Sequence, residues 1–181
     1  KALASFGLSI PKTVLVSPQM FSVETIDFDN DMVRSYQRHY INVDRERYDR
    51  WLVSLCDKNI DKSFSTRYIK SEKYESGLKV TLLKDGVKET FSTCILVGAD
   101  GANSRVKKEF MPVNNIKKYI SIQEWFENTN ELNQFVAMFD EEISDFYSWI
   151  IPKDDHIIFG SAVQEGMDAT TYHNLQKKKL E

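Results

Sequence analysis

The most informative stretch of the chain is LVGADGANSRV, at residues 96–106. It overlaps the short apolar run of residues 94–97, which is typical of a strand buried on both faces in a parallel sheet. Two glycines then bracket Asp100, and a short helix is expected over residues 106–110. Because ligands of α/β sheets collect at the carboxyl ends of strands, this order of strand, acidic turn and helix start predicts a binding site.

The residue types in this turn suit a nucleotide. Asp100 can accept a hydrogen bond from a sugar hydroxyl, while Gly98 and Gly101 allow close backbone approach and positive φ. The amides that open the next helix, capped by Asn103 or Ser104, can face a pyrophosphate. A glycine turn with an aspartate cap also occurs without any ligand. The complete G-A-D-G-x-x-S-x-V pattern after an apolar strand favours the nucleotide site.

Composition bounds the class of protein. The 181 residues are 41% hydrophobic and 28% charged, with 24 basic and 27 acidic side chains and a net charge of −3, which indicates one globular unit or two small ones. No apolar run approaches the roughly 18 residues of a membrane helix, and no basic patch with interleaved aromatics supports nucleic-acid binding. The 7 glycines are about half the number usual for this length, and no G-x-G-x-x-G or P-loop pattern occurs.

Both ends of the sequence resemble cuts through longer elements. Residues 1–7 read as the last turns of a helix stopped by Gly7, and residues 170–181 read as a helix without a C-cap glycine. We therefore expect that a phosphate-binding loop, if the protein has one, lies outside this stretch.

Cysteine and histidine give no sign of a disulfide or a metal site. Cys56 and Cys94 lack paired spacing and are expected to be reduced, buried residues of a cytoplasmic protein. The histidines have no second ligand at i+2, i+3 or i+4, so they are expected to be surface or strand residues; they are His39, His156 and His173.

Extended patterns flank a central section of mixed character. A hairpin is expected over residues 21–28 and 33–41. Apolar residues at i, i+3, i+4, i+7 and i+8 predict a helix over residues 45–57, with Asp44 as its N-cap. Asp85-Gly86 is a type I′ hairpin signal. The remaining predicted strands are residues 64–74, 78–84, 87–93, 116–127, 134–139, 147–152 and 156–163.

Three segments carry a resemblance to a known family. Residues 96–106 resemble the second FAD fingerprint, the DG motif, of flavoproteins with the p-hydroxybenzoate hydroxylase fold. Residues 43–52, VDRERYDRWL, resemble the helix start that precedes it in that class and lies near the flavin nucleotide. Residues 147–153, YSWIIPK, resemble the Y-x-W-x-F-P motif of geranylgeranyl reductase-like flavoproteins, which lies in the substrate cavity; Ile151 stands where that family has Phe.

The resemblance implies a fold of the α+β or α/β class. Residues 1–41 and 112–166 would form a β-rich substrate domain, and residues 42–111 the central part of a Rossmann-like FAD-binding domain. Residues 167–181 would begin a helical segment. The family's N-terminal G-x-G-x-x-G and C-terminal G-D motifs are missing from this stretch, so residues 1–181 alone are expected to be colourless and inactive.

The resemblance also implies site residues. The residues expected at FAD are Arg45, Gly98, Asp100, Gly101, Ala102 and Ser104. Asp100 would hold a ribose hydroxyl and Arg45 would offset phosphate charge. Those expected at a small hydrophobic substrate are Tyr147, Trp149 and Pro152. No residue stands out as an acid, base, nucleophile or metal ligand. The implied reaction passes a hydride from reduced flavin to a carbon–carbon double bond of an isoprenoid-like substrate, with NAD(P)H or another reductant as electron donor.

Two alternatives stay open. A flavin monooxygenase of the same fold shares the DG motif, and only Tyr147 and Trp149 favour a reductase. A non-enzymatic ligand-binding or interaction module would use the DG turn structurally, and Tyr147, Trp149 and Ile151 would then be alternating core residues of a strand. A hydrophobic substrate makes peripheral membrane contact reasonable, although no amphipathic basic helix indicates it. The sequence says nothing of the oligomeric state.

Overall fold

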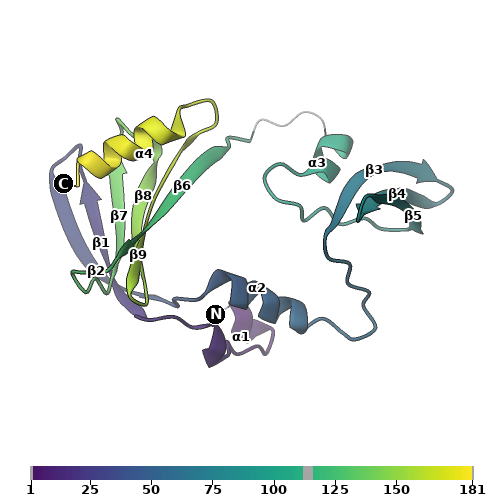
Figure 1. Ribbon diagram of the computed structural model, residues 1–181, viewed down its shortest axis with the longest axis horizontal. Helices are drawn as coiled ribbons and strands as arrows, with labels where there is room; N and C mark the ends of the chain where they lie inside the picture. The colour runs from purple at the N-terminus through teal and green to yellow at the C-terminus, as the bar shows by residue number, and fades with distance from the viewer. Residues whose placement is uncertain (1, 112–115, 181) are drawn as a thin grey trace. The chain divides into compact units, whose positions relative to one another are not determined.

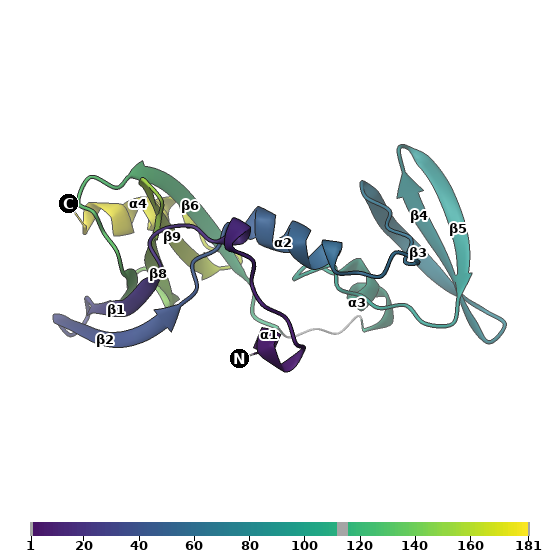
Figure 2. The ribbon, with the colours of Figure 1, turned by 90° about the horizontal axis from the view of Figure 1, so that it is seen from below.

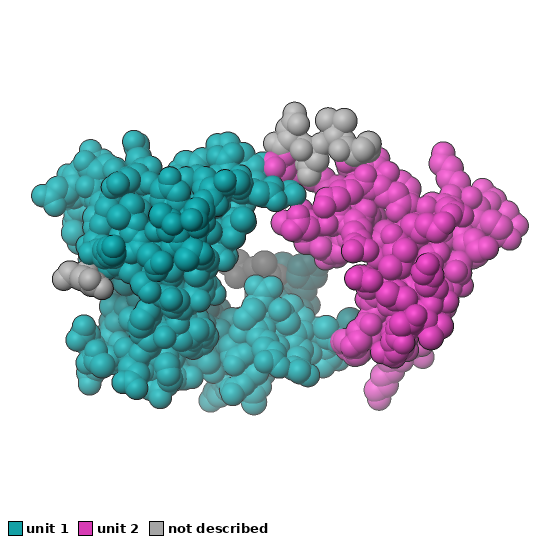
Figure 3. All heavy atoms as spheres, turned by 45° about the horizontal axis from the view of Figure 1, so that its top comes forward, with its two compact units in different colours: residues 1–56, 117–181 teal, residues 57–116 magenta. Residues whose placement is uncertain are grey.

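The computed structural model describes residues 2–111 and 116–180 of the chain (Figure 1). They form two compact units (Figure 3). The first unit comprises Lys1–Cys56 and Lys117–Glu181, and the second comprises Asp57–Ile116. These limits follow contacts within the chain, and they place the predicted helix after Asp44 with the flanking β-rich segments.

A mixed six-stranded sheet organises the first unit, in the order β2-β1-β7-β8-β9-β6. All neighbours are antiparallel except β1 and β7, which are parallel. Figure 2 shows the β1–β2 hairpin at one edge of this sheet. Each strand matches a predicted one, because the alternating patterns are local signals. The strands are β1 Met20–Asp27, β2 Met32–Tyr40, β6 Tyr119–Glu127, β7 Phe135–Asp140, β8 Ser144–Lys153 and β9 His156–Gln164.

The helix α4, Ala169–Lys178, covers one face of this sheet (Figure 1). Its side chains bond to three different strands: Gln176 to Ser148 of β8, His173 to Ser161 of β9, and Lys177 to Glu124 of β6. The core beneath consists of Val136, Met138 and Phe159. Because successive side chains of a strand point to opposite faces, the other face carries the intervening residues. We call it the aromatic face, and it includes Gln123, Trp125, Tyr147, Trp149, Ile158 and Gly160.

The predicted helix after Asp44 is present as α2, Arg45–Ser54. Asp44 caps it by accepting a hydrogen bond from the N–H of Arg47 at 2.9 Å. The expected apolar stripe is only partly covered, and no residue of this fully described helix is buried. Two shorter helices precede the sheet. They are α1 Ala2–Ser5, which ends before Gly7 at φ +68° as predicted, and the 3₁₀ helix η1 Lys12–Val14.

The described residues of the second unit form a three-stranded antiparallel sheet and one helix. Asp85 and Gly86 both have positive φ, at 49° and 81°, which confirms the predicted type I′ turn. Val80, 5% exposed, is the buried apolar residue of this sheet. Its elements are β3 Thr66–Tyr74, β4 Gly77–Lys84, β5 Val87–Thr93 and α3 Arg105–Phe110.

The prediction of a buried parallel strand at residues 94–97 is wrong. These residues pair with no strand among those the structure describes, and Ile95 and Val97 are 77% and 79% exposed. A strand buried on both faces needs neighbouring strands and covering helices, and the described part of the second unit supplies neither for this segment.

Two further predictions about single residues are corrected. Cys56 and Cys94 are exposed free cysteines, because Cys56 follows the uncovered end of α2 and Cys94 follows β5. His173 is neither a surface nor a strand residue: it lies in α4 and is 2% exposed. Its Nδ1 lies 2.7 Å from the Ser161 hydroxyl, and its Nε2 lies 3.3 Å from Glu124.

Candidate functional site

The G-A-D-G turn closes onto the start of α3 through the carboxylate of Asp100. It accepts hydrogen bonds from the Ser104 hydroxyl, from the N–H of Arg105 at 2.7 Å and from the N–H of Val106 at 3.4 Å. Ser104, one of the two residues considered as the cap, is the N-cap of α3 and accepts from the N–H of Lys107 at 2.9 Å. The hydrogen bond from Ser104 lowers the pKa of Asp100, so this carboxylate is ionised at neutral pH.

The two glycines of the turn are needed for different reasons. A Cβ atom at Gly98 would lie 2.8 Å from Cβ of Val106, so only glycine lets the turn pack against α3. Gly101 has φ +78°, in the left-handed region where other residues are strained. Gly101 and Ala102 are both exposed. The turn therefore presents accessible backbone beside a charged carboxylate.

Capping α3 leaves Asp100 room for a further donor. An ionised carboxylate offers about four lone-pair positions, and the hydrogen bonds above use three of them. A ligand hydroxyl can therefore be added without uncapping the helix. The predicted residues that the structure brings together in this turn are Gly98, Asp100, Gly101, Ala102 and Ser104.

A second carboxylate anchors α3 to the sheet of the second unit. Glu109, near the end of α3, accepts hydrogen bonds from the N–H of Ser71 at 2.9 Å and from its hydroxyl at 2.8 Å. It also accepts one from the Tyr68 hydroxyl at 2.6 Å. Burial and the neighbouring Glu109 raise the pKa of Tyr68, which keeps this hydroxyl a donor. These contacts fix the helix that carries the turn at its start.

Tyr147 and Trp149 lie on the aromatic face, two residues apart on β8. Their rings lie edge to face with centroids 5.9 Å apart, and the Tyr147 ring also stacks on the ring of Phe146 with centroids 4.5 Å apart. The indole of Trp149 covers Gly160 of β9, where a Cβ atom would overlap the ring. Its Nε1 is buried and has no partner among the described residues. The two predicted substrate residues thus form one aromatic surface on the sheet.

Pro152, the third predicted substrate residue, lies on the face of β8 opposite Tyr147 and Trp149 and is fully buried. Its carbonyl accepts a hydrogen bond from the side-chain amide of Asn42 at 2.7 Å. Asn42, itself 2% exposed, also donates to the carbonyl of Pro18 at 3.0 Å. In this structure Pro152 therefore anchors the end of β8 to the segment that leads into α2.

Arg45 lies at the rim of a cavity of about 490 Å³ within the first unit. Its guanidinium pairs with Asp49 one turn along α2, with Nε 2.9 Å from Oδ1, and its side chain is 82% exposed. The cavity extends from the first turn of α2 to the aromatic face and the β8–β9 turn. Other residues that line it include Val16, Gln123, Trp125, Lys153, His156 and Ile158.

Several residues around these sites escaped sequence reasoning. Glu109 contacts residues 38 and 41 positions away, a pairing that depends on how α3 packs on β3. Gly160 gives no motif signal, and its role follows from the register that places it beside Trp149. The sequence could have identified Lys153 as a candidate site residue, because it follows Pro152 in the YSWIIPK segment.

No helix in the described part of the chain is both long and apolar enough to cross a membrane.

Comparison with known proteins gives relatives by sequence. No family model matches the chain. "Protein CbrA" of Escherichia coli O9:H4 (strain HS) is 37% identical over 172 residues, which cover 95% of this chain and 47% of that protein. "Protein CbrA" of Shigella sonnei (strain Ss046) is 36% identical, with 95% and 49% covered. The chain spans about half the length of the curated relatives it matches.

Solved structures show what fold this is. A flavoprotein/dehydrogenase from Cytophaga hutchinsonii aligns with a TM-score of 0.62 and 12% identity, over 81% of this chain and 40% of that one. CmlS, a flavin-dependent halogenase, aligns with a TM-score of 0.68 and 14% identity, over 90% of this chain and 33% of that one. The chain therefore has the fold of part of these flavoproteins, which confirms the predicted α+β class.

Proposed function

We propose that this chain is part of an FAD-dependent oxidoreductase. The observation that carries the proposal is the fold shared with the two flavoproteins, which extends over 81% and 90% of this chain. The G-A-D-G turn agrees with it, since its exposed glycine backbone and ionised Asp100 suit the sugar and phosphates of a dinucleotide. We infer that the curated relatives, about twice as long, share this activity.

The residues of the turn would hold FAD by complementary roles. Asp100 would accept a hydrogen bond from a ribose hydroxyl, and the amides of Gly101 and Ala102 would approach the pyrophosphate. Ser104 would keep Asp100 in place through the hydrogen bond it already donates. Arg45 would offset phosphate charge after releasing Asp49. When bound, FAD supplies the redox chemistry, and the chain supplies binding and orientation.

The aromatic face would bind the substrate. Tyr147 and Trp149 offer adjoining rings, and Trp125 adds a third that is 60% exposed. Aromatic surfaces of this kind suit an apolar ligand and exclude water. We propose an isoprenoid-like molecule whose carbon–carbon double bond is reduced, as in geranylgeranyl reductase-like flavoproteins. Peripheral membrane contact and a cytoplasmic location belong to the same proposal.

A second candidate reaction is monooxygenation by a flavoenzyme of the same fold, in which reduced flavin reacts with oxygen. The structural likeness to a flavin-dependent halogenase, at a TM-score of 0.68, supports the monooxygenase as a second candidate. The two candidates differ in whether oxygen is consumed.

A single-turnover assay of the full-length protein distinguishes them. The flavin is reduced without oxygen, an isoprenoid alcohol or diphosphate is added, and the flavin spectrum and product mass are followed. The proposed reductase reoxidises its flavin while the substrate gains two hydrogens. Reoxidation only after oxygen is admitted, with an oxygen atom in the product, would support the monooxygenase and overturn the reductase.

A further inference from the structure

We propose that the cavity of about 490 Å³ in the first unit binds an apolar molecule that carries an anionic group, and that Lys153 anchors this group. The inference names the substrate class of the proposed enzyme and to that extent rests on the proposed function. The volume of the cavity lies within the range typical of small-molecule sites.

Lys153 is a half-buried cation whose partners are uncharged. Its ammonium group donates to the side-chain oxygen of Asn42 at 2.5 Å and to the carbonyl of Val43 at 2.7 Å. Burial lowers the pKa of Lys153, while Asp44 and Asp154 oppose this only through longer-range attraction. An ammonium group has three N–H donors, so one remains for a ligand in the cavity that Lys153 lines.

The acidic groups at the cavity have partners of their own. Asp44 caps α2, and Asp154 accepts from the N–H of Ser17 at 2.8 Å. The other two carboxylates are also engaged, with Glu46 2.9 Å from Arg50 and Asp155 2.6 Å from His156. Burying a charge without a counter-ion is unfavourable. An anionic ligand group would supply the counter-ion that Lys153 lacks among its hydrogen-bond partners.

Apolar side chains also line the cavity. Trp125 of β6 lines it and is 60% exposed, and its cross-strand partner Ile158 of β9 also lines it and is buried. The Trp125 ring also lies edge to face with the ring of His156 in the β8–β9 turn, with ring centroids 6.1 Å apart. A ligand that satisfies both Lys153 and these apolar side chains needs an apolar, preferably planar body as well as an acid.

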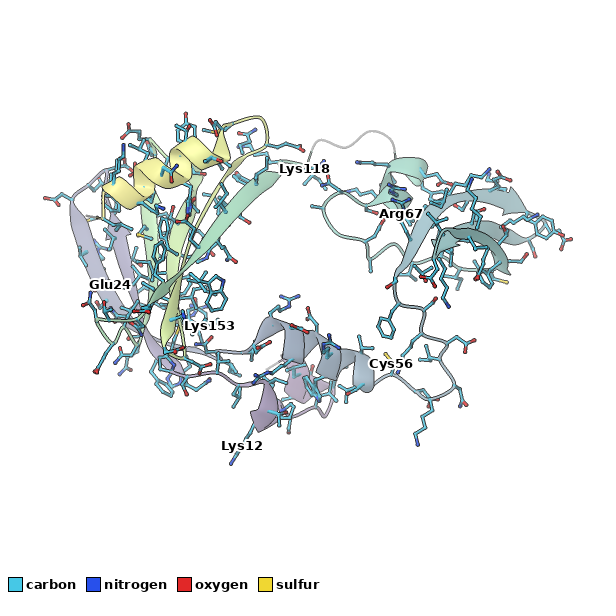
Figure 4. All side chains as sticks on the ribbon, in the orientation of Figure 1. Lys12, Glu24, Cys56, Arg67, Lys118 and Lys153 are labelled. Atoms are coloured by element: carbon cyan, nitrogen blue, oxygen red, sulfur yellow. The ribbon has the colours of Figure 1, made fainter. Side chains whose placement is uncertain are left out.

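Figure 4 labels the residues for a matched test: Lys153 lies at the end of the strands, and Lys12 on the segment that precedes them. Lys12 is exposed and does not line the cavity. The carboxylate and phosphate forms of the anion share their chemistry, so the probes are 2-naphthoate and 2-naphthyl phosphate. The neutral 2-naphthalenemethanol is the reference. Binding is measured by titration calorimetry on the full-length protein at low salt.

We expect the wild type to bind at least one acid about tenfold more tightly than the alcohol, the effect of one charge-assisted hydrogen bond. Which acid binds better identifies carboxylate or phosphate as the source. Lys153→Met should remove the preference, and Lys12→Met should retain it. Trp125→Ala should weaken all three probes together.

Equal affinity of the wild type for acid and alcohol would overturn the inference, as would an unchanged preference in a folded Lys153→Met protein. If Lys153→Met fails to fold, the wild-type comparison and Trp125→Ala still decide. The flavin spectrum of the same samples is independent: a protein that holds FAD without preferring the acids refutes only this inference. A protein that prefers the acids but takes up no FAD refutes only the proposed function.

Discussion

The carboxylate of Glu109 accepts a hydrogen bond from the hydroxyl of Tyr68 at 2.6 Å and so joins α3 to β3 across 41 residues of sequence. The same helix is capped by Ser104, which donates to Asp100. One end of this short helix therefore shapes the candidate nucleotide turn, and the other end is tied to the sheet.

Replacing Glu109 with alanine should destabilise the second unit and weaken FAD binding together. Glu109→Ala removes the acceptor of Tyr68 and Ser71, and because the site is exposed we expect a loss of about 1 kcal/mol in the free energy of unfolding. Urea unfolding followed by circular dichroism measures it. Glu89→Ala, at an exposed position of β5, is the control. Equal effects of both substitutions would refute the anchoring role.

Substitutions of Asp100 and of Ser104 should affect FAD binding and folding stability to different extents. Asp100→Asn keeps one acceptor for the cap but removes the charge and the second acceptor oxygen, so FAD affinity should fall about tenfold, together with a loss of stability. Ser104→Ala removes the N-cap of α3 and should cost about 1 kcal/mol of stability. FAD titration and urea unfolding of each full-length variant provide the two readouts. If Asp100→Asn binds FAD as tightly as the wild type, the aspartate is only a cap.

Gly160→Ala should be destabilising because the new methyl group overlaps the indole of Trp149. Overpacking of this kind costs about 1–3 kcal/mol. The double variant Gly160→Ala with Trp149→Leu should lose much of that penalty, since the overlapping ring is gone. Additive effects in the double-mutant cycle would show that the two residues do not meet.

The ion pair between Glu124 and Lys177 should make stability depend on pH. The hydrogen bond from Lys177, at 2.6 Å, lowers the pKa of Glu124 below its ordinary value. A carboxyl whose pKa is lowered by folding contributes stability above its unfolded pKa and loses that contribution as the pH falls through its folded pKa. Wild type should therefore exceed Lys177→Met in stability at pH 7, and the difference should shrink in acid.

The control for this pH dependence is Lys178→Met, at the neighbouring exposed position of α4. Its difference from the wild type should stay constant between neutral and acidic pH. A difference between wild type and Lys177→Met that grows as the pH falls would contradict the assignment.

Local signals predicted most of the fold. The Asp85-Gly86 turn and the Asp44 cap each depend on a few adjacent residues, and both appear where the sequence indicates. The prediction of a buried strand at residues 94–97 failed because it depended on distant segments. An apolar run forms a buried strand only if other segments pair with it and cover it.

The candidate sites were predicted unevenly for a similar reason. The motif placed Asp100 and Ser104 in one turn, and strand alternation placed Tyr147 and Trp149 on one face. Glu109 and Gly160 act through residues on other elements. Their roles depend on packing and strand register, which a single sequence does not reveal.

The most direct test of the account is the visible absorption spectrum of the purified full-length protein, with the released chromophore identified by chromatography. We predict a yellow protein whose flavin is FAD, bound at about one molecule per chain. A colourless protein that takes up no FAD when FAD is added in excess would contradict the central claim and leave the G-A-D-G turn as a helix cap.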